Sequence, residues 1–137
     1  MTVRNVDLFN RTGESVSCAI HHSEVPPWRM IAECVLWGSW SFEQPDLYEC
    51  TLRLRERIEP LGWLLRCNCS CLNAFVSGMA RDMSGAQRIE LFPFDRDLAA
   101  TPRIVELFDP APVHQIGTIE EQEAWLREFW AAFDGRK

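Results

Sequence analysis

The sequence predicts an α+β protein in which two main helices cover a mostly antiparallel sheet of four to six strands. Two observations support this fold class. Apolar residues alternate with a period of two, as in half-buried strands, along residues 63–75 and in several shorter segments. Apolar residues recur at three- and four-residue steps in two other segments, which predicts helices at about 46–59 and 119–133. No linker interrupts the chain, so we expect a single domain over residues 1–137.

The N-terminal third is interpreted as strands and turns. Residues 1–13 are polar at intervals, which fits a loose arm or a short first strand. Residues 15–23 alternate and predict a strand. The pair Pro26–Pro27 lacks amide donors for a sheet and therefore predicts a loop. Residues 33–43 alternate again and predict a second strand, in which Gly38 indicates a bulge or a close backbone approach.

The first helix is predicted between residues 46 and 59. Its apolar stripe consists of Leu47, Cys50, Leu54 and Ile58. Glu49 precedes Arg53 by four residues, which is the stabilising orientation for an ion pair on a helix. Pro60 and Gly62 predict the end of this helix.

Residues 63–75 are predicted to form the central strand, with Cys67, Cys69 and Cys71 on its buried face. Residues on one face of a strand lie about 6.7 Å apart. Two thiolates on one zinc ion lie about 3.8 Å apart. We therefore interpret these cysteines as buried thiols and assign no metal and no cofactor. A metal or redox role would require this segment to be a loop.

Three shorter elements follow the predicted central strand. Residues 77–83 predict a short helical turn that Ser77 caps. Residues 87–94 predict a strand at a sheet edge, because Pro93 interrupts it. Residues 103–108 are rich enough in β-branched residues to predict another strand, although a helical turn is an alternative.

The C-terminal helix has the clearest sequence signals. Thr118 and Glu121 have the spacing of a capping box, in which each side chain bonds the backbone amide of the other residue. Gly135 lies where a left-handed residue would end the helix. Its apolar stripe consists of Trp125, Leu126, Phe129, Trp130, Ala132 and Phe133.

Composition excludes some classes of function. The formal net charge is −6 and the isoelectric point is about 5.0, which argues against nucleic acid as a ligand. The same charge suits a basic protein partner. No segment is long and apolar enough for a signal peptide or a membrane span, so we expect a cytoplasmic protein with reduced thiols.

The histidines do not predict a catalytic centre. His21 and His22 are adjacent on a predicted strand and therefore point to opposite faces, so they cannot share one ligand with Glu24 unless the strand bends. His114 stands alone in a proline-flanked loop.

Serine and carboxylate residues give no catalytic pattern either. Ser77 precedes a glycine but lacks the G-x-S-x-G elbow of a nucleophile. We expect Arg81 and Asp82 to form an internal ion pair, and Glu43 and Asp46 to serve as helix caps. No catalytic residue is assigned.

Four motifs carry a resemblance to a known group of proteins. They are G-x-W-x-F-E at Gly38–Glu43, S-G-M-A-R-D-M at Ser77–Met83, I-V-E-L-F-D-P at Ile104–Pro110 and G-T-I-E-E-Q-E-A-W at Gly117–Trp125. As a set, they resemble small bacterial proteins, some of which look like the immunity partners encoded beside polymorphic or contact-dependent toxins. The likeness covers about the C-terminal two-thirds of the chain, and the three clustered cysteines are not part of it.

The resemblance and the acidic charge together predict a cytoplasmic protein-binding module, an immunity protein that masks the active site of a toxin domain. The expected interface consists of residues that face away from the predicted core, namely Trp37, Glu43, Arg81 and Asp82, with Asp95, Asp97 and Glu106 as a second patch. The alternative is a small enzyme or ligand-binding domain with a pocket near the turn at residues 77–83.

Overall fold

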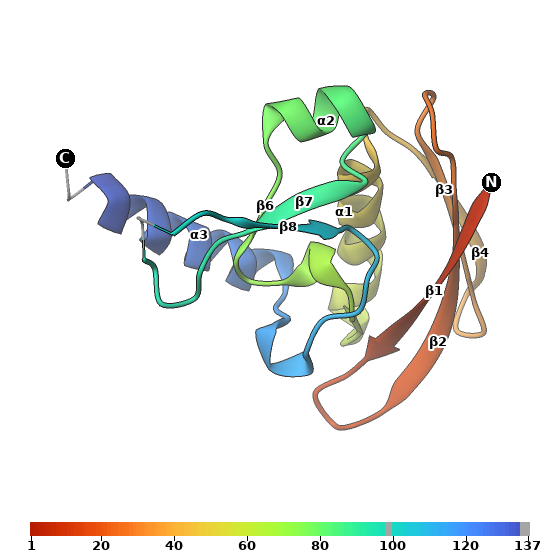
Figure 1. The fold of residues 1–137 in the computed structure, drawn as a ribbon. Coiled ribbons are helices and arrows are strands. Elements are labelled where there is room, and N and C mark those ends of the chain that lie inside the picture. The colour runs from red at the N-terminus through yellow and green to blue at the C-terminus, as the bar shows by residue number, and fades with distance from the viewer. Residues whose placement is uncertain (98–99, 135–137) are drawn as a thin grey trace.

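The fold is α+β, as predicted, and consists of two antiparallel sheets with helices between and beside them. The computed structural model describes residues 1–97 and 100–134. Figure 1 shows a curled five-stranded sheet with helix α1 (Leu47–Ile58) against its inner face. A smaller three-stranded sheet lies on the other side of α1, with helices α2 (Gly78–Ser84) and α3 (Ile119–Asp134) beside it.

The large sheet begins at the N-terminus. Its strands, in spatial order, are β4 (Gly38–Glu43), β3 (Arg29–Cys34), β2 (Ser15–His22), β1 (Thr2–Phe9) and β5 (Leu64–Leu65). The strand predicted at residues 15–23 is therefore confirmed. Of the two alternatives for residues 1–13, the first strand is confirmed and the loose arm is wrong, because β1 pairs with β2 along its whole length and has a second neighbour in β5.

The strand predicted at residues 33–43 is instead a hairpin. The chain turns at residues 35–37 between β3 and β4, and Cys34 pairs with Gly38. Gly38 has a φ of +89°, a left-handed conformation that suits glycine. Alternation continues across the turn because both strands of the hairpin point their apolar residues to the same face.

The predicted central strand at residues 63–75 is also wrong. The chain forms the short edge strand β5, then a 3₁₀ turn η2 (Asn68–Ser70), then the short strand β6 (Ala74–Phe75). The backbone amides of Asn68 and Cys69 donate to the carbonyls of Asp109 and Leu107, so this segment is held by a distant loop. Burial does not alternate in this segment, because the five consecutive residues from Cys67 to Cys71 are all buried.

The small sheet has the order β6, β7 (Arg88–Leu91), β8 (Arg103–Glu106). The strands predicted at residues 87–94 and 103–108 are confirmed in their central residues. The edge position expected for the first of them is wrong, because β7 lies between β6 and β8. Pro93 follows the last paired residue of β7 and does not interrupt it.

The three helices agree with their sequence signals. Asp46 caps α1, and Ser77 caps α2 by accepting from the amide of Ala80. The capping box of α3 is formed, because the Thr118 hydroxyl accepts from the Glu121 amide and the Glu121 carboxylate accepts from the Thr118 amide. The cap predicted at Gly135 lies outside the described residues.

The core lies between the large sheet and α1 and continues to the small sheet. One buried cluster includes Leu8 and Ile20 from the large sheet, Leu54 from α1 and Ile89 from β7. The two short 3₁₀ helices η1 (Glu59–Leu61) and η3 (Val113–Gln115) connect elements at the surface of this core. No helix within the described ranges is both long enough and apolar enough to cross a membrane.

Candidate functional site

The side chain of Arg55 is buried at the centre of the protein and forms hydrogen bonds with several elements. This side chain is fully buried on α1. Its Nη1 donates to the carbonyl of Cys69 at 3.2 Å, its Nη2 donates to the carbonyl of Gly117 at 3.2 Å, and its Nε contacts Glu59 Oε2 at 3.1 Å. A buried arginine is tolerated when every donor has an acceptor. Arg55 therefore holds α1, the η2 turn and the start of α3 together.

The cysteines predicted on one strand face lie close together in the η2 turn. The Sγ atoms of Cys67 and Cys69 are 3.0 Å apart, whereas a regular strand would separate them by about 6.7 Å. Burial alone raises the pKa of Cys69, but hydrogen bonding to Cys67 and the charge of Arg55 lower it to about 7. Burial raises the pKa of Cys67 well above its usual value. The pair therefore favours one thiolate and one thiol.

Within the described part of the chain, Cys67 and Cys69 have no third side chain placed to complete a metal site. Among residues 1–97 and 100–134, no group of three or more His, Cys, Asp or Glu side chains is arranged to hold a metal ion. Cys18, Cys50 and Cys71 are buried separately, and burial raises the pKa of each to about 12. These cysteines are buried free thiols, as interpreted. The strand spacing used to argue against a shared metal is wrong, because Cys67 precedes the η2 turn and Cys69 lies in it.

The histidines occupy separate environments. His21 Nε2 lies 2.9 Å from Glu33 on the outer face of the large sheet. His22 points to the opposite face, where it stacks on Phe108 with ring centroids 5.2 Å apart. His114 is exposed in η3. The adjacent histidines are therefore divided between two faces, as the strand geometry predicted.

The outer face of the small sheet is open to solvent. Ile89 and Leu91 of β7 point inward and are buried. Phe75, Glu90 and Ile104 are paired in register across the three strands, so their side chains share the outer face. Ile104 is 69% exposed there. Phe75 is half-buried on this face, because Trp130 of α3 packs against its ring.

Helix α2 extends this surface on one side. Met79 and Met83 are four residues apart, so they lie on one face of the helix, and they are 71% and 79% exposed. Both line a shallow hollow of about 330 Å³ that also includes Ile104 and Glu90. Ser77 lines the same hollow, but its hydroxyl accepts the capping hydrogen bond of α2.

Helix α3 extends the same surface on the other side. The ring of Trp130 meets Phe75 edge to face, with centroids 5.9 Å apart, and also contacts Phe133. Trp130 and Phe133 are each partly exposed, near the end where α3 projects from the body in Figure 1. We call the surface formed by Phe75, Met79, Met83, Ile104 and Trp130 the exposed apolar face.

Some predicted interface residues lie at this face. Asp82 is exposed on α2, and Glu106 points outward from β8, where it pairs with Arg88 at 3.2 Å. Arg81 instead turns toward α1 and bonds Asp46 at 2.7 Å and Glu49 at 3.3 Å. The ion pair predicted between Arg81 and Asp82 is therefore replaced by one that joins two helices.

The remaining predicted residues are separated from this face. Trp37 lies in the turn before β4, where its ring stacks on Trp40 with centroids 4.3 Å apart. Glu43 pairs with Arg29 at the end of β4 rather than capping a helix. Asp95 and Asp97 are exposed in the loop that follows β7. The structure therefore divides the seven residues among several surfaces.

Sequence reasoning missed the apolar members of the exposed face. Met79 and Met83 carried a usable signal, because their spacing places them on one face of a helix capped by Ser77. The placement of Phe75 and Ile104 on one face required the register of the small sheet. Comparison with known proteins adds no assignment, since no family model and no curated protein matches the chain.

Proposed function

We propose that this chain is a protein-binding module, and specifically an immunity protein that neutralises a bacterial toxin domain by masking its active site. The observation that carries the proposal is the exposed apolar face. Soluble proteins rarely expose a large apolar patch, and such a patch usually marks a site of interaction with a partner. Methionine adapts its shape to a partner, and tryptophan is enriched among the residues that dominate binding energy.

The charges around this face favour a basic partner. Glu90 lines the hollow and Asp82 is exposed next to Met83 on α2. Arg88 also lines the hollow, but its charge is paired with Glu106 at 3.2 Å. The whole chain has a formal net charge of −6. An acidic surface accelerates association with a basic one and discriminates against acidic competitors. Many enzymes that act on nucleic acids have basic clefts, so a toxin of that kind is a suitable partner.

The face is held in position by buried contacts. Arg81 of α2 binds Asp46 and Glu49 of α1, and Gly85 at the end of α2 accepts a hydrogen bond from the Leu47 amide at 2.7 Å. Gln122 anchors α3 to Arg55. A surface that is already ordered loses little conformational entropy on binding, which favours tight association.

The proposed mechanism is steric and electrostatic. Met79, Met83 and Trp130 supply apolar anchors at the two sides of the small sheet, and the carboxylates between them oppose basic residues of the toxin cleft. The bound chain then prevents substrate from reaching the toxin. Under this proposal the protein acts in the cytoplasm of a bacterium that also encodes the toxin, as the resemblance of its four motifs implies.

The hollow beside α2 suits a partner side chain better than a catalytic centre. Its walls combine the apolar side chains of Met79, Met83 and Ile104 with the charged residues Arg88 and Glu90. The Ser77 hydroxyl is occupied by helix capping. This observation favours protein binding over the alternative of an enzyme with a pocket at residues 77–83.

Co-expression with the toxin domain encoded beside the gene tests this function. Cells that express this domain should survive with the wild-type chain and die with Met83→Lys, because a lysine ammonium buried at the interface would be repelled by the basic cleft of the toxin. Val35→Lys is the matched control, since Val35 is 84% exposed in the distant β3–β4 turn. Survival with Met83→Lys, or death with the wild type at equal expression, would contradict the proposal.

A further inference from the structure

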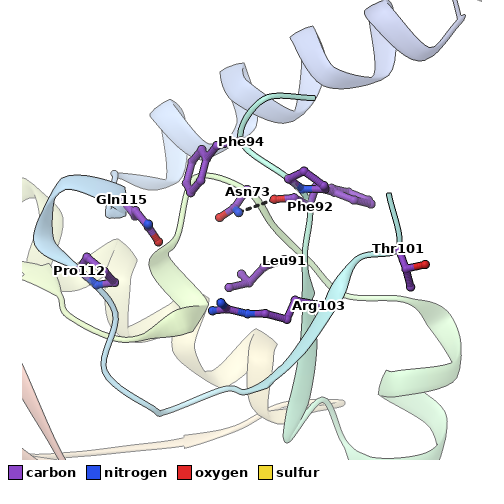
Figure 2. A pocket seen from close by; sticks show the side chains of 9 residues that line it. Asn73, Leu91, Phe92, Phe94, Thr101, Arg103, Pro112 and Gln115 are labelled. Carbon is purple, nitrogen blue, oxygen red and sulfur yellow. Dashed lines mark hydrogen bonds between the residues drawn. The ribbon is translucent and has the colours of Figure 1, made fainter. Parts of the chain in front are cut away.

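A second concave site lies apart from the exposed apolar face. It has a volume of about 320 Å³ and is formed by the end of β7, the start of β8 and the segment that contains η3. Figure 2 shows Leu91, Phe92, Phe94 and Pro112 around it, and these give it apolar walls. Its volume is at the lower end of the range for ligand pockets. It therefore suits a small group of about one amino-acid residue.

One buried hydrogen-bond acceptor in this pocket has no partner. Asn73 is 4% exposed, and its Nδ2 donates to the carbonyl of Phe92 at 2.5 Å. Because a carbonyl only accepts, the amide nitrogen must face Phe92, and Oδ1 must point away from it. No donor from the described residues reaches this oxygen. A buried acceptor in this state is costly, so the site favours a ligand that carries a donor.

A cation also lines the pocket. Figure 2 shows the guanidinium of Arg103 beneath Leu91. Burial raises the pKa of Cys71 to about 12, and Arg103 lies near enough to oppose this rise. No ion pair between described residues includes Arg103, and no carboxylate lines the pocket. The pocket is therefore electropositive within an acidic protein.

We propose that this pocket binds a carboxylate that also bears an N–H donor and an apolar group. Arg103 would bind the carboxylate, Asn73 Oδ1 would accept from the N–H, and Leu91 and Phe94 would contact the apolar group. Gln115 at the rim can donate or accept. This chemistry is that of an amido acid, which occurs either as a free N-acylated amino acid or as the C-terminal residue of a peptide. The proposal is independent of the function assigned to the exposed apolar face.

Isothermal titration of the full chain with four probes tests this site. The probes are N-acetyl-leucine, N-acetyl-leucinamide, acetyl-Gly-Gly-Leu with a free carboxylate, and the same tripeptide as its amide. N-acetyl-leucine should bind with a dissociation constant below about 1 mM. Its amide should bind at least about tenfold more weakly, because a hydrogen bond to a charged group is lost. Equal binding of acid and amide, or no saturation by either acid up to about 10 mM, would overturn the proposal.

The tripeptides distinguish the two sources of the ligand. Binding of the tripeptide acid as tight as that of N-acetyl-leucine assigns the pocket to a peptide C-terminus. If N-acetyl-leucine binds and the tripeptide acid does not, the pocket is assigned to a free amido acid. Either result supports the site, because both require the carboxylate.

A pair of arginine variants locates the binding. Arg103→Gln should weaken N-acetyl-leucine binding by at least about tenfold. Arg127→Gln is the matched control, because Arg127 is an exposed arginine of α3 that takes part in none of the ion pairs between described residues. Nuclear magnetic resonance should also show a shift of the Asn73 side-chain amide on titration. Wild-type affinity in Arg103→Gln would contradict the assignment of the carboxylate to this residue.

Discussion

Arg55 Nη1 donates a hydrogen bond to Gln122 Oε1 at 2.9 Å in the interior of the protein. The same glutamine donates from Nε2 to the carbonyl of Cys69 at 3.1 Å and to that of Cys71 at 2.6 Å. The two side chains therefore join α1 and α3 through the buried η2 segment. Because α3 carries Trp130, this network connects the core to the exposed apolar face.

Removing the buried guanidinium should destabilise the protein strongly. Arg55→Met removes the donor of the Gly117 carbonyl and leaves Gln122 Oε1 with the 3.4 Å hydrogen bond from Tyr48. Glu59 loses its ion-pair partner and keeps the hydrogen bond from the Ile119 amide. The expected loss in the free energy of unfolding is about 3–5 kcal/mol, as for other broken buried ion pairs. Urea denaturation at neutral pH measures this change.

The control for this variant lies on the same helix. Arg57 is exposed and its guanidinium lies over the rings of Trp40 and Phe42, so Arg57→Met should cost no more than about 1 kcal/mol. If Arg55→Met and Arg57→Met lowered the free energy of unfolding equally, the hydrogen bonds of the buried Arg55 would contribute no more to stability than the contacts of an exposed arginine.

The thiol of Cys69 should make stability depend on pH. Its pKa in the folded protein is about 7, below the ordinary value of 9.0, so folding favours the thiolate. This contribution is fully present above pH 9 and is lost as the pH falls through 7. The difference in unfolding free energy between the wild type and Cys69→Ala should therefore grow by about 2 kcal/mol from pH 7 to pH 9.

Comparison with Cys69→Ala is necessary because other thiols act in the opposite direction. Burial raises the pKa of Cys18, Cys50 and Cys71 to about 12, so their contribution is lost as the pH rises above 9. Urea denaturation under reducing conditions at each pH gives the difference. A value that stays constant from pH 7 to pH 9 would show that Cys69 remains a thiol in the folded protein.

Gly85 should not tolerate a side chain. Its φ is +59°, and a Cβ atom there would lie 2.2 Å from Cε2 of Trp28. Gly85→Ala should therefore cost about 2–4 kcal/mol, from backbone strain and overpacking together. Gly62→Ala is the control, because Gly62 has a φ of +89° with open space around its Cα. Thermal unfolding measures the stability of both variants, and the difference between them gives the cost of the steric clash at Gly85. An equal loss of stability in the two variants would exclude a tight contact between the end of α2 and Trp28.

The helices were predictable because their signals are local. The Asp46 and Ser77 caps, the Thr118–Glu121 capping box and the Glu49–Arg53 pair each involve residues within four positions of one another. The two halves of the hairpin at Gly38 were missed as separate strands because apolar alternation does not reveal a turn. The prediction of a central strand at residues 63–75 was wrong for a different reason. Backbone hydrogen bonds to the distant carbonyls of Leu107 and Asp109 hold this segment, and local sequence does not reveal them.

The candidate site was less predictable than the fold. Acidic residues such as Asp82 and Glu106 could be chosen from their polarity, but Arg81 could not be placed without its contact to Asp46. Local sequence shows that Met83 lies on a helix face, but only the tertiary structure shows that this face is uncovered. The same holds for Ile104, whose neighbours are set by the register of β7 and β8.

The central claim is that the exposed apolar face binds a toxin domain. Its most direct test is a quantitative pull-down from the bacterium that encodes the chain, in which mass spectrometry compares the wild type with Met83→Lys and Val35→Lys. We predict near-equimolar recovery of a toxin domain with the wild type and with Val35→Lys, and at least about thirtyfold less with Met83→Lys. Equal recovery with all three proteins, or no stoichiometric toxin domain in cells that express it, would contradict the claim.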